Sequence, residues 1–216
     1  MPWTQRLVED PGSLEALLRP ETALERALVV HPEVRRGLLW GEPRFGHPEG
    51  KVGIHVREVL DNIDHITGLS RAVREKLRII TLAHDAFKYK EDRSRPRDWH
   101  NHHAMLARRF MEHYTDDPVI LDVIELHDEA YYAWLAMKNE VFREENPQKS
   151  LQYLFDRVWS FLDIYYLFFK CDTQTGDKTQ APVKWFEKSV PGLQVIDILP
   201  HTPASLQFPT AVLLNE

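Results

Sequence analysis

Apolar residues recur at spacings of three and four along most of the chain, which is the period of an amphipathic helix. The pattern predicts helices over residues 13–30, 52–67, 71–90, 101–114, 118–144 and 149–171. Asp116 and Asp117 precede Pro118 as in a typical helix start, and the sequence NPQKS separates the last two segments. The chain is therefore expected to be all-α, a bundle of helices.

The pattern changes after about residue 176, where prolines alternate with short β-branched runs. Such a stretch favours loops, with room for a small hairpin. We therefore predict a mostly irregular, proline-rich tail over residues 176–216 that packs on the helical body.

Composition narrows the class of protein. With 43% hydrophobic and 28% charged residues the chain is typical of a soluble globular protein. The single cysteine, Cys171, excludes a disulfide framework and a cysteine-based zinc site. The most apolar window, 151–169, contains charged residues, and the N-terminus lacks a signal-peptide pattern. We expect a cytoplasmic protein without a membrane partner. A net charge of −6 disfavours general nucleic-acid binding. The sequence is compatible with an oligomer.

Four ionisable residues continue the apolar stripes of four different predicted helices: His55, His84, His127 and Asp172. A buried polar group without a partner costs roughly 1–3 kcal/mol, so side chains placed in this way are expected to converge. Imidazole and carboxylate groups together are typical ligands of iron, manganese, zinc, nickel and cobalt. The pattern therefore predicts a metal site.

Asp85 follows His84 directly, about 100° further round a helix, so both side chains can address one site and the carboxylate can bridge two ions. Lys88 lies one turn later, where it could neutralise a phosphoryl oxygen or protonate a leaving group, or be a solvated lysine at a helix end. Arg93 and Arg95 follow in a basic loop that suits a substrate phosphate, although interspersed acidic residues also fit a solvated loop.

The ordered series of histidines and aspartates resembles the HD-domain superfamily of metal-dependent phosphohydrolases. The resemblance lies in GHPEGKVGIHVREVLDNI (46–63), LAHDAFK (82–88), HHAMLA (102–107), IELHD (124–128) and FFKCD (168–172). It implies an HD-like, metal-binding helical core over residues 46–175, with residues 1–45 as an N-terminal helical extension, and it places Asp85 and Lys88 in catalytic roles. The implied metal ligands are His55, His84, Asp85, His102, His127 and Asp172.

Some positions stay open within this resemblance. His103 is an alternative to His102, because it shares a helix face with Leu106 and Phe110. Phe87 stands where the family often has glycine, and its ring is expected to narrow the pocket. Asp128 is expected on the helix surface, and the remaining histidines on the surface or in loops: His31, His47, His65, His100, His113 and His201.

The resemblance implies hydrolysis of a phosphoester, for example a nucleotide, by metal-activated water. One or two ions of manganese, iron, nickel, cobalt or zinc would serve, with magnesium also allowed. If His102 and His127 both bind, the site has six protein ligands and two metals. The alternative is a di-iron oxygenase on the same scaffold. A non-catalytic domain that binds a metal or nucleotide is the third hypothesis.

Overall fold

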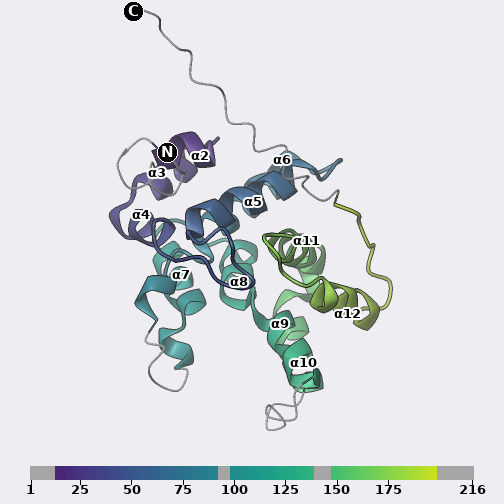
Figure 1. Cartoon of the computed structure of the whole chain (residues 1–216). Coiled ribbons are helices and arrows are strands. Elements are labelled where there is room, and N and C mark those ends of the chain that lie inside the picture. Colours follow the sequence, from purple (N-terminus) through teal and green to yellow (C-terminus); the bar gives the residue numbers. More distant parts are fainter. Residues whose placement is uncertain (1–12, 92–97, 139–146, 199–216) are drawn as a thin grey trace, which may run out of the picture.

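A computed structural model describes residues 13–91, 98–138 and 147–198, and its architecture is all-α, as predicted. Its elements, in chain order, are α2 (Ser13–Leu18), α3 (Ala23–Val30), α4 (Pro32–Leu38), α5 (Val52–Asp64), α6 (Arg71–Ala83), η1 (Lys88–Lys90), η2 (Trp99–Asn101), α7 (His103–Met111), α8 (Pro118–Leu126), α9 (Glu129–Lys138), α10 (Pro147–Val158), η4 (Trp159–Phe161), α11 (Leu162–Thr173) and α12 (Ala181–Ser189). Figure 1 shows their arrangement.

The helices begin where the sequence offers capping groups. The backbone N–H of Val73 donates to the Ser70 side chain at the start of α6. Asp117 accepts from the N–H of Val119 at the start of α8, where Pro118 occupies the first turn. These side chains satisfy N–H groups that have no partner inside the helix, so the starts are fixed by local chemistry.

Several of the long predicted helices are interrupted. The segment 71–90 leaves the α-helix after Ala83, and 118–144 breaks between Leu126 and Glu129. Each break holds a His-Asp pair, His84–Asp85 or His127–Asp128. The prediction that His84 and Asp85 lie within a helix is wrong, because they occupy the turn that follows it. Periodicity missed the breaks because the apolar stripe continues across each turn.

The core is formed by α5, α6, α8 and α11, which lie side by side (Figure 1). Helix α11 supplies large buried rings, including Tyr165, Phe168 and Phe169. The Tyr165 hydroxyl donates to the Leu126 carbonyl at 3.0 Å and accepts from the Ala130 N–H at 3.2 Å. It therefore holds both sides of the α8–α9 break, next to His127.

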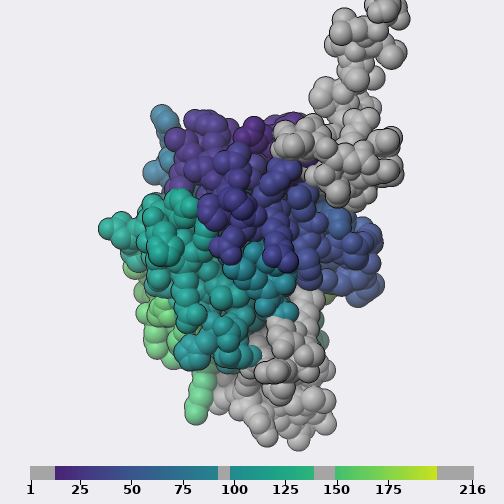
Figure 2. All heavy atoms as spheres, turned by 90° about the vertical axis from the view of Figure 1, so that its left-hand side faces the viewer, coloured from purple at the N-terminus to yellow at the C-terminus, as the bar shows by residue number. Residues whose placement is uncertain are grey.

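The N-terminal helices pack closely on the core. Helix α2 contacts α5, α3 contacts α6 and α4 contacts α5, and Figure 2 shows these purple helices directly against the blue and teal segments. A Cβ atom on Gly37 would lie 1.6 Å from the Ala86 carbonyl oxygen. Only glycine allows α4 to approach the turn that carries Asp85 so closely.

A buried ion pair also joins the N-terminal helices to the core. The guanidinium of Arg78 on α6 donates to Glu25 on α3 through Nη2 at 2.8 Å and Nε at 3.1 Å. Only 2% of the Arg78 side chain and none of the Glu25 side chain is exposed. Arg78 also lies 3.3 Å from Glu21, but the fully buried Glu25 carboxylate depends on Arg78 for compensation of its charge.

The small hairpin suggested for the tail is not found in its described part, residues 176–198. That part contains helix α12, with Pro182 in its first turn and Val183 and Phe186 buried. Phe186 packs against Phe155 and Phe169. Proline at a helix start is compatible with the helix, which the sequence pattern did not separate from loop proline. No helix among the described residues has the length and apolar character needed to cross a bilayer.

Candidate metal centre

Four histidines and two aspartates meet between the core helices. His55 comes from α5 and Asp172 from the end of α11, while His84, Asp85 and His127 lie just after α6 and α8, and His103 opens α7. The four histidines and Asp85 are buried, and 16% of the Asp172 side chain is exposed. They form two groups whose ligand atoms lie within 4.8 Å of one another.

The first group consists of His55, His84 and Asp172. Oδ1 of Asp172 lies 2.9 Å from Nε2 of His55 and 3.7 Å from Nε2 of His84. Two imidazole nitrogens and one carboxylate oxygen therefore point at one small space, and all three were predicted from the sequence.

The second group consists of Asp85, His103 and His127. Oδ1 of Asp85 lies 3.4 Å from Nε2 of His103 and 3.5 Å from Nε2 of His127. The other oxygen of Asp85, Oδ2, lies 3.5 Å from Nε2 of His84 and 3.8 Å from that of His55. Asp85 thus presents one oxygen to each group, as a carboxylate that bridges two ions would.

The structure brings His103, and not His102, together with Asp85 and His127. His102 is the N-cap residue of α7, and its Nε2 lies 3.3 Å from Glu91 Oε1 and 3.5 Å from the Tyr132 hydroxyl. The geometry favours the alternative ligand, His103. His102 was the ligand implied by the resemblance, and helical spacing from Leu106 and Phe110 offered His103 as the alternative.

The ring orientations suit metal binding. Nδ1 of His84 donates to the Thr81 carbonyl at 2.9 Å, and Nδ1 of His127 donates to the Ile124 carbonyl at 2.8 Å. Nδ1 of His103 pairs with Glu91 Oε1 at 2.8 Å. Because oxygen acceptors hold the proton on Nδ1, each Nε2 can present a lone pair to the centre, the usual arrangement around metal-binding histidines.

Several atoms at the centre have no hydrogen-bond partner among the described residues although they are buried: Nε2 of His55, Nε2 of His84 and Oδ1 of Asp85. The 2.9 Å contact of His55 with Asp172 does not have hydrogen-bond geometry. A buried polar atom without a partner costs roughly 1–3 kcal/mol. The two nitrogens face the first group and Oδ1 of Asp85 faces the second, so each group offers an unpaired atom that a cation would satisfy.

Protonation of the first group also fits. Burial raises the pKa of Asp172, but the positive charge of Lys178 and the nearby imidazole of His55 outweigh it and hold the pKa well below its usual value. Burial, helped by Lys178, lowers the pKa of His55 to about 4. A neutral imidazole and an ionised carboxylate are the forms that bind metals.

In the second group, His127 is expected to be protonated at neutral pH. Burial lowers the pKa of His127, but Asp128 and Asp85 outweigh it and raise the pKa to about 9. Burial raises the pKa of Asp85, whereas Lys88 and His84 hold it well below its usual value. Metal binding to this group is therefore expected to release a proton from His127.

A pocket of about 430 Å³ opens onto both groups. Its lining includes Asp85, His127 and Asp172 together with three basic side chains, Arg44, Lys88 and Lys178. Lys88 forms an ion pair with Asp85, and Nζ of Lys178 lies 3.2 Å from Asp172 Oδ1. Asp128 and Asp177 also line the pocket, so four carboxylates face the three basic side chains. The space becomes suited to an anion only when cations occupy the metal groups.

Two side-chain placements differ from expectation. Asp128 is not a remote surface residue: its Oδ2 lies 3.5 Å from Nε2 of both His103 and His127, because it sits in the same turn as His127. Phe87 does not narrow this pocket but is 2% exposed and packs against Phe110. Arg93 and Arg95 lie outside the described residues.

Sequence reasoning missed residues that contact the centre. Glu91 was part of a mixed-charge loop, and its contact with His103 follows from the fold. Glu49 Oε1 lies 3.0 Å from His47 and 3.7 Å from His55, so the loop histidine His47 adjoins the site too. Only Asp128, next to a predicted ligand, had a local signal. Lys178 lies six residues after Asp172, and Arg44 lies just before the segment 46–63, but no helical spacing connects either residue with the site.

Comparison of the chain with protein-family models, with curated proteins and with solved structures gave no match. The resemblance to HD domains therefore rests on the residues described above.

Metal binding is expected to stabilise the fold, because it would satisfy the unpaired buried atoms. At about 100 times the dissociation constant, one bound ion raises the free energy of unfolding by about 2.7 kcal/mol. Urea unfolding with manganese, iron(II), cobalt, nickel or zinc, against a chelator-treated sample, measures this. His55→Gln should reduce the gain, while His113→Gln, at an exposed position, should keep it. An unfolding midpoint that no metal moves would contradict the site.

Proposed function

We propose that this chain is an HD-type metal-dependent phosphohydrolase. The observation that carries the proposal is the pocket in which Arg44, Lys88 and Lys178 lie beside the carboxylates of Asp85 and Asp172. Basic side chains next to a metal-ligand set suit a phosphorylated substrate, because both bind phosphoryl oxygens. The substrate is then a phosphoester of a small molecule, with nucleotides included.

In this proposal, some residues bind the metal ions and others bind the phosphoryl group. His55, His84 and Asp172 would hold one ion, His103 and His127 a second, and Asp85 would be shared. Bound divalent ions would polarise a phosphoryl oxygen and bring the pKa of a bound water near neutrality. Lys88 and Lys178 lie at the two aspartates, where their ammonium groups can bind the remaining phosphoryl oxygens.

The donor set suggests which metals to test. It is rich in imidazole, and carboxylates complete it, a combination that favours manganese, iron, cobalt, nickel or zinc over magnesium. Elemental analysis of protein purified without chelator or metal-affinity resin gives the number of ions per chain. A screen of phosphoesters with the identified metal then tests the activity. Retention of no metal together with hydrolysis of no phosphoester would overturn the proposal.

The same donors favour one second candidate, a di-iron oxygenase on the HD scaffold. Four imidazoles and two carboxylates, one of them placed to bridge, suit two irons as well as two hydrolytic metals. Two irons per chain and substrate-dependent oxygen uptake would move the assignment to the oxygenase. Phosphate release without oxygen uptake supports the hydrolase.

Removing the ammonium of Lys178 is expected to weaken substrate binding while metal content stays unchanged. We expect Lys178→Met to raise KM about tenfold, since a charge-assisted hydrogen bond contributes about 1.5–3 kcal/mol. Steady-state kinetics on the best phosphoester measures this. Lys184→Met, on the exposed side of α12, is the matched control and should leave KM unchanged. Equal KM values for the two variants would remove Lys178 from the substrate site.

A further inference from the structure

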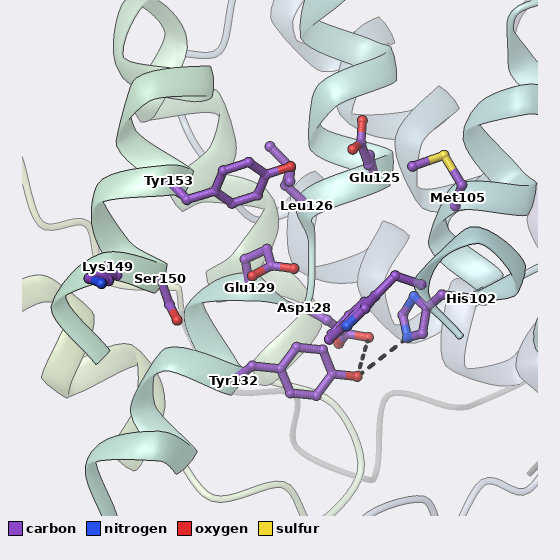
Figure 3. Close-up of a pocket in the computed structure, with 11 residues that line it drawn as sticks. His102, Met105, Glu125, Leu126, Asp128, Glu129, Tyr132, Lys149, Ser150 and Tyr153 are labelled. Carbon is purple, nitrogen blue, oxygen red and sulfur yellow. Dashed lines mark hydrogen bonds between the residues drawn. The ribbon is translucent and has the colours of Figure 1, made fainter. Parts of the chain in front are cut away.

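Two cavities that adjoin the metal groups differ in whether their polar atoms have partners. The larger, of about 510 Å³, lies beside His102 and Asp128 (Figure 3). There the Tyr132 hydroxyl lies 3.3 Å from Asp128 Oδ2 and 3.5 Å from His102 Nε2, as the dashed lines in Figure 3 show. Among the described residues, no buried side-chain polar atom of this lining lacks a hydrogen-bond partner, so the cavity does not indicate a particular ligand.

The smaller cavity, of about 20 Å³, lies between the first metal group and the loop that precedes α5. A space of this size holds one ion or one water molecule. Its charged and imidazole side chains are Arg44, His47, Glu49, His55, Asp85 and Lys88. Lys88 forms an ion pair with Asp85, and Arg44 is exposed. Two histidines and one glutamate remain to bind whatever fills the cavity.

These three residues form a third group whose ligand atoms lie within 4.8 Å of one another. Oε1 of Glu49 lies 3.0 Å from Nδ1 of His47 and 3.7 Å from Nδ1 of His55. Oε2 of Glu49 and Nδ1 of His55 have no hydrogen-bond partner among the described residues, although their side chains are only 4% and 3% exposed. Burial of two unpaired polar atoms is unfavourable, and a cation beside them would satisfy both.

The loop that carries the group is held by a tight turn. The backbone N–H of His47 donates to the Arg44 carbonyl at 2.9 Å, and the N–H of Arg44 donates to the His47 carbonyl at 3.1 Å. Gly46, inside this turn, has a φ of +81°, which favours glycine. His47 also lines the basic pocket over the metal groups. The third group is therefore preformed and lies next to the space where the substrate would bind.

The donors are of the same kind as in the first group, which also has two imidazoles and one carboxylate. We propose that His47, Glu49 and His55 bind a third divalent metal ion, in addition to the two ions of the proposed hydrolase. His55 then bridges two ions, through Nε2 to the first group and through Nδ1 to the third. The proton of its neutral imidazole passes to solvent when both ions are bound, while His47 keeps its own proton on Nε2.

Counting bound ions tests this independently of any activity. Metal-free full-length chain is dialysed to equilibrium against cobalt(II), and elemental analysis gives the ions per chain at saturation. We expect three ions. A saturation value of two or fewer would leave the small cavity to water and overturn the proposal. Three ions without phosphoester hydrolysis would support the third site and contradict the hydrolase, whereas two ions with hydrolysis would do the reverse.

Variants locate the third ion. Glu49→Gln keeps the shape of the side chain but removes its charge, and we expect it to bind one ion fewer. Glu42→Gln, in the same loop with a side chain that is 84% exposed, is the matched control and should bind three. Circular dichroism checks that both variants fold. An unchanged count in Glu49→Gln would overturn the proposal.

A second variant separates a metal ligand from a residue that only orients His55. His47→Gln should also lose one ion, because its ring contacts Glu49 and is not part of the first or second group. His113→Gln, at an exposed position, should keep three. If Glu49→Gln loses two ions and His47→Gln loses none, Glu49 orients His55 in the first group and the third site is wrong.

Discussion

Replacing Asp85 with asparagine is expected to abolish phosphoester hydrolysis, with kcat/KM lowered by about a thousandfold or more. The reason is geometric, since Oδ1 of Asp85 faces His103 and His127 while Oδ2 faces His84 and His55. An amide nitrogen in place of one oxygen cannot bind an ion, so at least one group loses its shared ligand. Metal content per chain should fall at the same time, and elemental analysis beside the kinetic assay measures both.

Asp116→Asn is the matched control for this change, because Asp116 is exposed and belongs to neither metal group. It should keep full activity and metal content. If Asp85→Asn retains both ions, the bridging role of Asp85 is wrong, even if activity falls. If it retains activity as well, the metal centre is not the catalytic site.

Replacing Arg78 with methionine is expected to lower the free energy of unfolding by about 3–5 kcal/mol. The change leaves the Glu25 carboxylate buried without its partner, and none of that side chain reaches solvent. Urea denaturation of metal-free protein measures the loss. The double variant Arg78→Met with Glu25→Leu should be more stable than the single variant, because no uncompensated charge remains.

Arg74→Met provides the comparison, since Arg74 stands one turn earlier on α6 and pairs with Glu21 and Asp64 near the surface. Its side chain is 30% exposed, so the expected loss is about 1 kcal/mol or less. Equal losses for Arg74→Met and Arg78→Met would show that burial does not decide the strength of the Arg78 pair.

The sequence predicted the fold class because helical periodicity is strong in this chain, and capping residues such as Ser70 and Asp117 mark helix starts locally. It did not predict where the long segments break. The turns at His84–Asp85 and His127–Asp128 are held by tertiary contacts, such as the approach of Gly37 to Ala86 and the bonds of Tyr165. Contacts between distant residues leave no local pattern.

Most ligands of the candidate site could be predicted from the sequence, but the other residues around it could not. His55 and Asp172 lie on the inward faces of α5 and α11, and His84 and His127 continue the apolar stripes of α6 and α8 into the turns that follow, so their convergence could be inferred one helix at a time. The choice between His102 and His103 depended on where α7 begins, because His102 is its N-cap and His103 its first helical residue. Periodicity alone left that starting point open. Lys178 follows Asp172 in the loop after α11, and Arg44 lies in the loop before α5, so helical spacing does not predict that either side chain meets the site.

The close approach of Gly37 to Ala86 affects where the chain could be cut without disturbing the site. A boundary at residue 45 would separate the metal-ligand residues from helices α2–α4. Yet α4 packs against the turn that positions Asp85, and α3 supplies the counter-charge of Arg78. An insertion or deletion in the N-terminal helices would therefore misalign ligands far along the sequence. A fragment chosen for domain fusion or recombination should therefore include helices α2–α4.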